Sequence, residues 1–94
     1  MRTRIDWKNY KPVGVQSVDM CASVIFGNRV KSIPIKAVHL LPRMYGQFKL
    51  WAEKNLEREL LPDEKLEFDG VYIEEGSDQQ TTPLLVELWE QHAN

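Results

Sequence analysis

The sequence has little cysteine and histidine, the residues that build disulfides and most zinc sites. Its one cysteine, Cys21, excludes a disulfide within the chain, so the fold must rest on packing. The two histidines, His39 and His92, show no short spacing to each other or to Cys21, unlike the paired ligands of zinc sites. We therefore expect no metal site and no cofactor.

Other functional signatures are also missing. The five glycines are dispersed and form no phosphate-binding loop, and no Gly-x-Ser-x-Gly motif marks a nucleophile. Cys21 lies in an apolar pattern, where a thiol is usually an inert core group. Neither a signal-peptide core nor an apolar run of the roughly 20 residues that span a membrane occurs. We expect a cytoplasmic protein that is not an enzyme and does not bind a membrane.

What the sequence does contain is a globular composition with sorted charges. Its 94 residues, 43% of them hydrophobic, suit a single compact domain over 1–94. Residues 1–52 carry nine basic side chains against two acidic ones, a balance of +7. Residues 53–94 carry twelve acidic against three basic ones, a balance of −9. Such asymmetry points to a charged partner, or to two halves that neutralise each other within the fold or across a homodimer.

Polar and apolar residues alternate along two early segments, 2–7 and 17–26, which predicts strands. For the second segment, helical spacing of Val18, Cys21 and Ile25 is the competing interpretation, but the strand period matches more positions. The Gly-Asn pair that follows predicts a tight turn into a further strand near 29–33.

A β-hairpin over 65–75 is the best-defined local structure. Asp69-Gly70 is a favoured two-residue hairpin turn. In that register, Phe68 faces Val71 and Leu66 faces Ile73 on the apolar side, while Glu67 faces Tyr72 and Lys65 faces Glu74 on the other. Turn chemistry and apolar pattern therefore predict the same pairing.

Three further segments have helical features. An apolar stripe with helical spacing predicts a helix over 44–61 that Pro62 stops, and Thr82-Pro83 opens a predicted C-terminal helix. Residues 33–41 fit a short helix or a strand, and Pro42 ends either one. The predicted fold is α+β: a small antiparallel sheet covered on one side by a long central helix and a C-terminal helix. Its predicted strands lie near 2–7, 17–26, 29–33, 65–69 and 71–75.

The leading functional hypothesis is a small non-catalytic binding protein, of the inhibitor or immunity type, that docks on the basic surface of a protein partner through its acidic half. The predicted partner-binding residues are Glu67, Tyr72, Glu74 and Glu75, because an exposed tyrosine among carboxylates suits docking. The alternative is that Tyr72 packs under a neighbouring element and the acids only solubilise the hairpin.

A DNA-binding regulator is the rival hypothesis, because the segment 33–75 follows the order helix, turn, helix, wing. Its candidate nucleic-acid-binding residues are Arg43, Gln47, Lys54 and Arg58, which lie away from the apolar stripe of the central helix. The acids of the supposed wing and a sequence pI near 5.6 argue against it.

Overall fold

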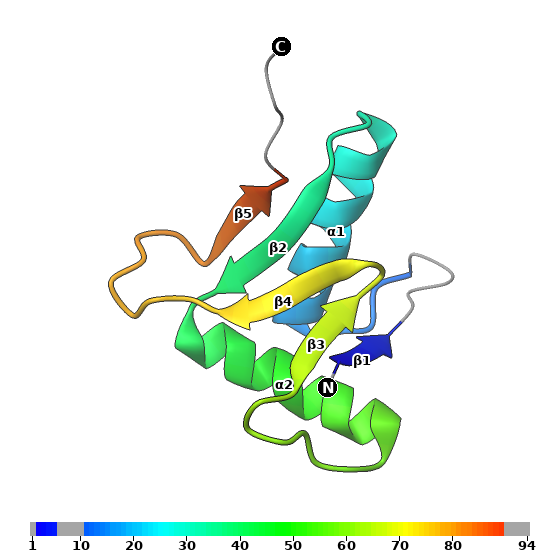
Figure 1. The fold of residues 1–94 in the computed structure, drawn as a ribbon, viewed down its shortest axis with the longest axis vertical. Coiled ribbons are helices and arrows are strands. Elements are labelled where there is room, and N and C mark those ends of the chain that lie inside the picture. Colours follow the sequence, from blue (N-terminus) through cyan, green and yellow to red (C-terminus); the bar gives the residue numbers. More distant parts are fainter. Residues whose placement is uncertain (1, 6–10, 90–94) are drawn as a thin grey trace.

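The structure is a computed structural model that describes residues 2–5 and 11–89. Its elements are β1 (Arg2–Ile5), α1 (Gln16–Val30), β2 (Ile35–Leu40), α2 (Pro42–Leu56), β3 (Lys65–Phe68), β4 (Val71–Glu75) and β5 (Leu84–Leu88). Two helices pack beside one sheet (Figure 1), which confirms the predicted α+β class. The predicted strand 2–7 is confirmed as far as Ile5, and its last two positions lie outside the described residues.

The five strands form one mixed sheet in the order β1-β3-β4-β2-β5. The β1–β3 and β2–β4 pairs are parallel, whereas the β3–β4 and β2–β5 pairs are antiparallel. The prediction of an antiparallel sheet is therefore wrong. Between β2 and β4 the chain forms both α2 and β3, and this long connection lets β4 start from the same end of the sheet as β2.

The predicted hairpin register is confirmed. Leu66 pairs with Ile73, Glu67 with Tyr72 and Phe68 with Val71. Asp69 and Gly70 form the turn, both with positive φ (52° and 86°), as a two-residue hairpin loop of this kind requires.

The predicted strands 17–26 and 29–33 are wrong, because α1 covers all of the first and ends at Val30 within the second, where residues 31–33 form a turn and the connection to β2. Its buried side chains include Val18, Cys21, Ala22 and Ile25, which follow the spacing of one helical face. The apolar residues of 17–26 fit both the strand period and the helix period. In the helix, the buried residues form one stripe that packs against the sheet. Phe26, which the strand pattern places with the apolar face, is 46% exposed.

Of the two structures predicted for residues 33–41, the strand is confirmed, since β2 lies at the centre of this segment and no helix precedes α2 there. The helix, turn, helix order of the DNA-binding hypothesis is therefore absent. β2 ends at Leu40, before Pro42 as predicted, and Pro42 then opens α2, because proline fits a first helical turn. The predicted end at residue 61 is also wrong: α2 stops at Leu56, where Glu57 takes a left-handed conformation with φ 58°.

The predicted C-terminal helix is wrong within the described residues, where Leu84–Leu88 form the edge strand β5. β5 pairs with the free side of β2, from Leu40 opposite Leu84 to Ile35 opposite Leu88. An apolar sequence of this kind fits a strand as well as a helix. The strand forms here because the backbone N–H and C=O groups on this side of β2 need hydrogen-bond partners. His92 lies outside the described residues.

One face of the sheet packs against both helices and forms the core (Figure 1). At its centre, the rings of Phe48, Trp51 and Phe68 meet edge to face, with centroids 5.3 to 5.9 Å apart. Neither helix covers the other face, which we call the open face. It carries the side chains that alternate with the core residues, among them His39, Tyr72 and Glu74.

Candidate functional site

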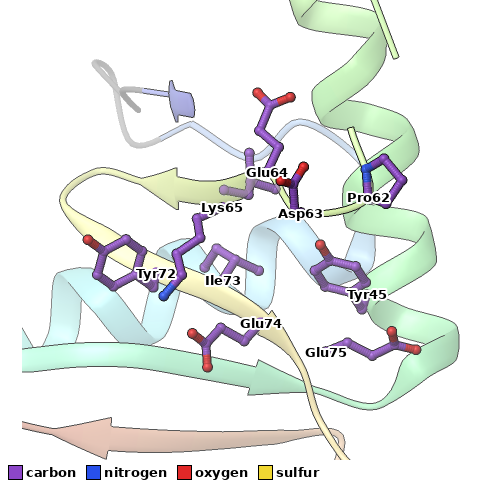
Figure 2. Close-up of a pocket in the computed structure, with 10 residues that line it drawn as sticks. Tyr45, Pro62, Asp63, Glu64, Lys65, Tyr72, Ile73, Glu74 and Glu75 are labelled. Atoms are coloured by element: carbon purple, nitrogen blue, oxygen red, sulfur yellow. The ribbon is translucent and has the colours of Figure 1, made fainter. Parts of the chain in front are cut away.

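A hollow of about 210 Å³ lies where the start of α2, the loop before β3 and the end of β4 meet (Figure 2). We call it the acidic hollow. The residues that line it are Tyr45, Pro62, Asp63, Glu64, Lys65, Leu66, Tyr72, Ile73, Glu74 and Glu75. Four of these are acidic and one is basic, so the lining carries a net negative charge.

Two tyrosines bound the acidic hollow. Tyr45 comes from α2 and Tyr72 from β4, and Figure 2 shows them at opposite ends, with Glu74 and Glu75 along one side. Burial raises the pKa of Tyr45, and the negative charges of Glu75, Glu74 and Glu53 raise it further. These three carboxylates therefore give this end of the hollow a negative potential.

One of the four carboxylates is already neutralised. Arg58 binds Glu64 through two contacts, Nη2 to Oε2 at 2.6 Å and Nη1 to Oε1 at 3.0 Å. The hydrogen bond from Arg58, together with the N–H of Leu61, lowers the pKa of Glu64 to about 2. Figure 2 shows that the Glu64 carboxylate points away from the hollow. It therefore stabilises the loop instead of binding a ligand.

Three of the four predicted partner-binding residues meet in the acidic hollow: Tyr72, Glu74 and Glu75. The expectation that Glu67 is an exposed member of this set is wrong, since it is only 8% exposed and does not line the hollow. Its strand lies inside the sheet, between β1 and β4, rather than at an edge. Tyr72 is half-buried, with Lys65 Nζ 5.4 Å from its ring centroid.

The four candidate DNA contacts do not form one free surface. Arg43 and Lys54 are exposed on α2. Gln47 Oε1 accepts a hydrogen bond from the backbone N–H of Ser17 at 3.0 Å, which ties α2 to the start of α1. Arg58 lies beyond the end of the helix and is held by Glu64. These four residues therefore do not form a continuous basic face on α2.

Sequence reasoning missed Tyr45 and Asp63 as neighbours of the predicted set, because they lie on segments that only the tertiary fold brings to β4. It also missed a second cluster on the open face. His39 of β2 lies between Glu87 of β5, with Nε2 to Oε1 at 2.8 Å, and Glu74 of β4, with Nδ1 to Oε2 at 3.5 Å. The hydrogen bond from His39 holds the pKa of Glu87 below its usual value. No local spacing connects these three residues; only the strand order does.

Cys21 is buried in the core as expected, and burial raises the pKa of its thiol to about 12. A thiol with that pKa holds its proton at neutral pH and is a poor nucleophile. Within 2–5 and 11–89, neither helix combines the length and apolar character needed to cross a bilayer.

Comparisons of the chain with protein-family models, with curated proteins and with solved structures found no match.

Proposed function

We propose that the chain is a small, non-catalytic binding protein that docks on a basic surface of a protein partner through the acidic hollow. One observation carries the proposal: Asp63, Glu74 and Glu75 border a concave site that also offers two tyrosine rings. Among the described residues that line it, Lys65 is the one basic side chain. The hollow is thus complementary in charge to a cation.

The occupant that this chemistry suits is a lysine or arginine side chain of the partner. Carboxylates accept strong, charge-assisted hydrogen bonds from such groups. Aromatic rings attract the same cations through their faces, and Lys65 already lies over Tyr72 in this way. A partner's cation would therefore find both kinds of contact within one hollow.

The charge distribution also supports rapid association. Opposite potentials on two proteins steer their encounter and chiefly raise the association rate, while a few desolvated aromatic contacts hold the complex. A protein of this kind acts as an inhibitor when the basic surface that it covers is the nucleic-acid-binding groove of an enzyme. The inert Cys21 thiol is in keeping with binding rather than catalysis.

NMR titration with a short arginine-rich peptide tests where a cationic ligand binds. We expect the largest amide shift changes around Tyr45, Tyr72 and Glu75, and we expect the Asp63→Asn/Glu75→Gln variant to abolish them. A matched control, Glu59→Gln/Asp78→Asn, removes two exposed acids outside the hollow and should leave the shifts unchanged. Equal shifts in both variants would refute binding in the hollow.

The same pair of variants distinguishes a foreign partner from a second copy of the chain. If the wild type dimerises with rising concentration and only the hollow variant stays monomeric, the occupant is the basic half of another copy. A monomeric wild type that binds the peptide supports the foreign partner.

A further inference from the structure

The cluster of His39, Glu74 and Glu87 offers three metal-binding side chains on three adjacent strands of the open face. One ligand atom from each residue lies within 4.8 Å of the other two. The histidine is central, since its two ring nitrogens face the two carboxylates at 2.8 and 3.5 Å. All three side chains are partly exposed, so an ion can reach them from solvent.

The sheet holds this cluster in place. β2 lies between β4 and β5, and His39 is directly opposite Glu74 in the parallel pair. Glu87 comes from the antiparallel neighbour, opposite Ala37, and so reaches His39 diagonally. The other oxygen of Glu87, Oε2, lies 3.5 Å from Lys36 Nζ. This ion pair helps to orient the carboxylate. Ligands on paired strands are better fixed than ligands on loops.

We propose that His39, Glu74 and Glu87 form a zinc-binding site. An imidazole nitrogen and carboxylate oxygens are ordinary zinc ligands, at about 2.0–2.2 Å from the ion. The imidazole favours zinc or a similar transition metal over Mg²⁺ and Ca²⁺, which take oxygen ligands. The ion would replace the hydrogen bond between His39 Nε2 and Glu87. The Glu74 carboxylate, which lies beside Nδ1, would turn towards the ion.

The remaining ligands of the ion can come from solvent, since all three side chains are partly exposed. Three protein ligands leave an open position on a four-coordinate zinc ion, which water can fill. By joining β5 to β2 and β4, the ion would secure an edge strand that otherwise pairs on one side only.

Isothermal titration of chelator-treated protein with zinc chloride tests the site, with native mass spectrometry to count bound ions. We expect one ion per chain and a rise in melting temperature with added zinc, because a ligand that binds only the folded state stabilises it. His39→Ala and Glu87→Gln should each weaken binding at least about tenfold, since even the loss of an outer-shell partner costs about that much. The surface change Glu87→Gln keeps the test valid if His39→Ala disturbs the strand.

Two controls make the assignment specific. His92→Ala removes the other histidine of the chain and should leave the affinity unchanged, as should the Asp63→Asn/Glu75→Gln variant of the acidic hollow. Because Glu74 borders both sites, it is left intact in both tests, so either proposal can fail alone. No zinc binding by the wild type, or equal binding by His39→Ala and Glu87→Gln, would overturn the zinc site.

Discussion

Arg58 fastens the loop after α2 by a bidentate contact to Glu64, six residues along the chain, at 2.6 and 3.0 Å. The side chain of Glu64 is fully inaccessible, whereas that of Arg58 is 44% exposed. The backbone N–H of Leu61 also donates to the same carboxylate, at 3.1 Å. The ion pair therefore fixes the loop that supplies one wall of the acidic hollow.

Replacing Arg58 by alanine should lower stability clearly, because it leaves the inaccessible Glu64 carboxylate without its cation. Urea denaturation of Arg58→Ala measures the loss as a lower midpoint. Lys54→Ala, which removes an exposed cation from the last turn of α2, is the matched control and should shift stability by no more than about 0.5 kcal/mol. Equal midpoints for the two variants would show that the contact contributes nothing to the fold.

The pH dependence of stability should report the same contact. The pKa of Glu64 falls from 4.5 to about 2 in the folded state, so the unfolded chain binds the proton more readily. The contribution of Glu64 is therefore complete above about pH 4.5 and is lost as the pH falls towards 2. In denaturation series between pH 2 and 6, the difference between wild type and Glu64→Gln should shrink on acidification. A difference that stays constant across this range would contradict the lowered pKa.

Two glycine substitutions should have opposite effects. Gly70→Val places a β-branched residue at φ 86°, which should cost about 1–3 kcal/mol. Gly27→Ala lies inside α1, where a Cβ meets no atom within 4 Å, and should stabilise by about 0.5–1 kcal/mol. Thermal or urea denaturation checks both. A destabilising Gly27→Ala would favour the turn that the sequence pattern predicts there over the helix.

Duplex DNA should not bind the protein at about 0.15 M salt, since the Arg58–Glu64 pair leaves no continuous basic face on α2 and the loop after it, and the acidic hollow lies beside them. An electrophoretic mobility shift assay over a salt series checks this expectation. If a tight, salt-sensitive shift does appear, Arg43→Ala and Lys54→Ala should flatten its salt dependence, because both side chains are exposed on α2. That outcome would favour the regulator over the docking protein.

The hairpin could be predicted from the sequence because everything that determines it is local. Asp69-Gly70 sets the turn and the flanking residues set the faces, so register and burial agree with the pattern. Residues 17–26 could not be assigned in this way, because their apolar positions satisfy both the strand and the helix period. For the last described segment, the deciding partner is the free side of β2, far away in sequence.

The candidate site was predictable only in part for the same reason. Tyr72, Glu74 and Glu75 follow from the hairpin, whereas Tyr45 and Asp63 reach the acidic hollow through the packing of α2 and the loop before β3. The inner position of the strand that carries Glu67 follows from β1 pairing with β3, which no local signal indicates. The His39 cluster likewise needs β2 to lie between β4 and β5 in the sheet, although α2 and β3 separate it from them in sequence.

The most direct test of the docking proposal is affinity capture from a lysate with three baits: wild type, Asp63→Asn/Glu75→Gln, and Glu59→Gln/Asp78→Asn. The captured protein is then purified, and its association rate with each bait is measured at low salt. We expect a basic partner whose association slows strongly with the hollow variant and stays unchanged with the control, because charges in the hollow steer the encounter. Unchanged association with the hollow variant would contradict the assignment of the acidic hollow as the docking surface.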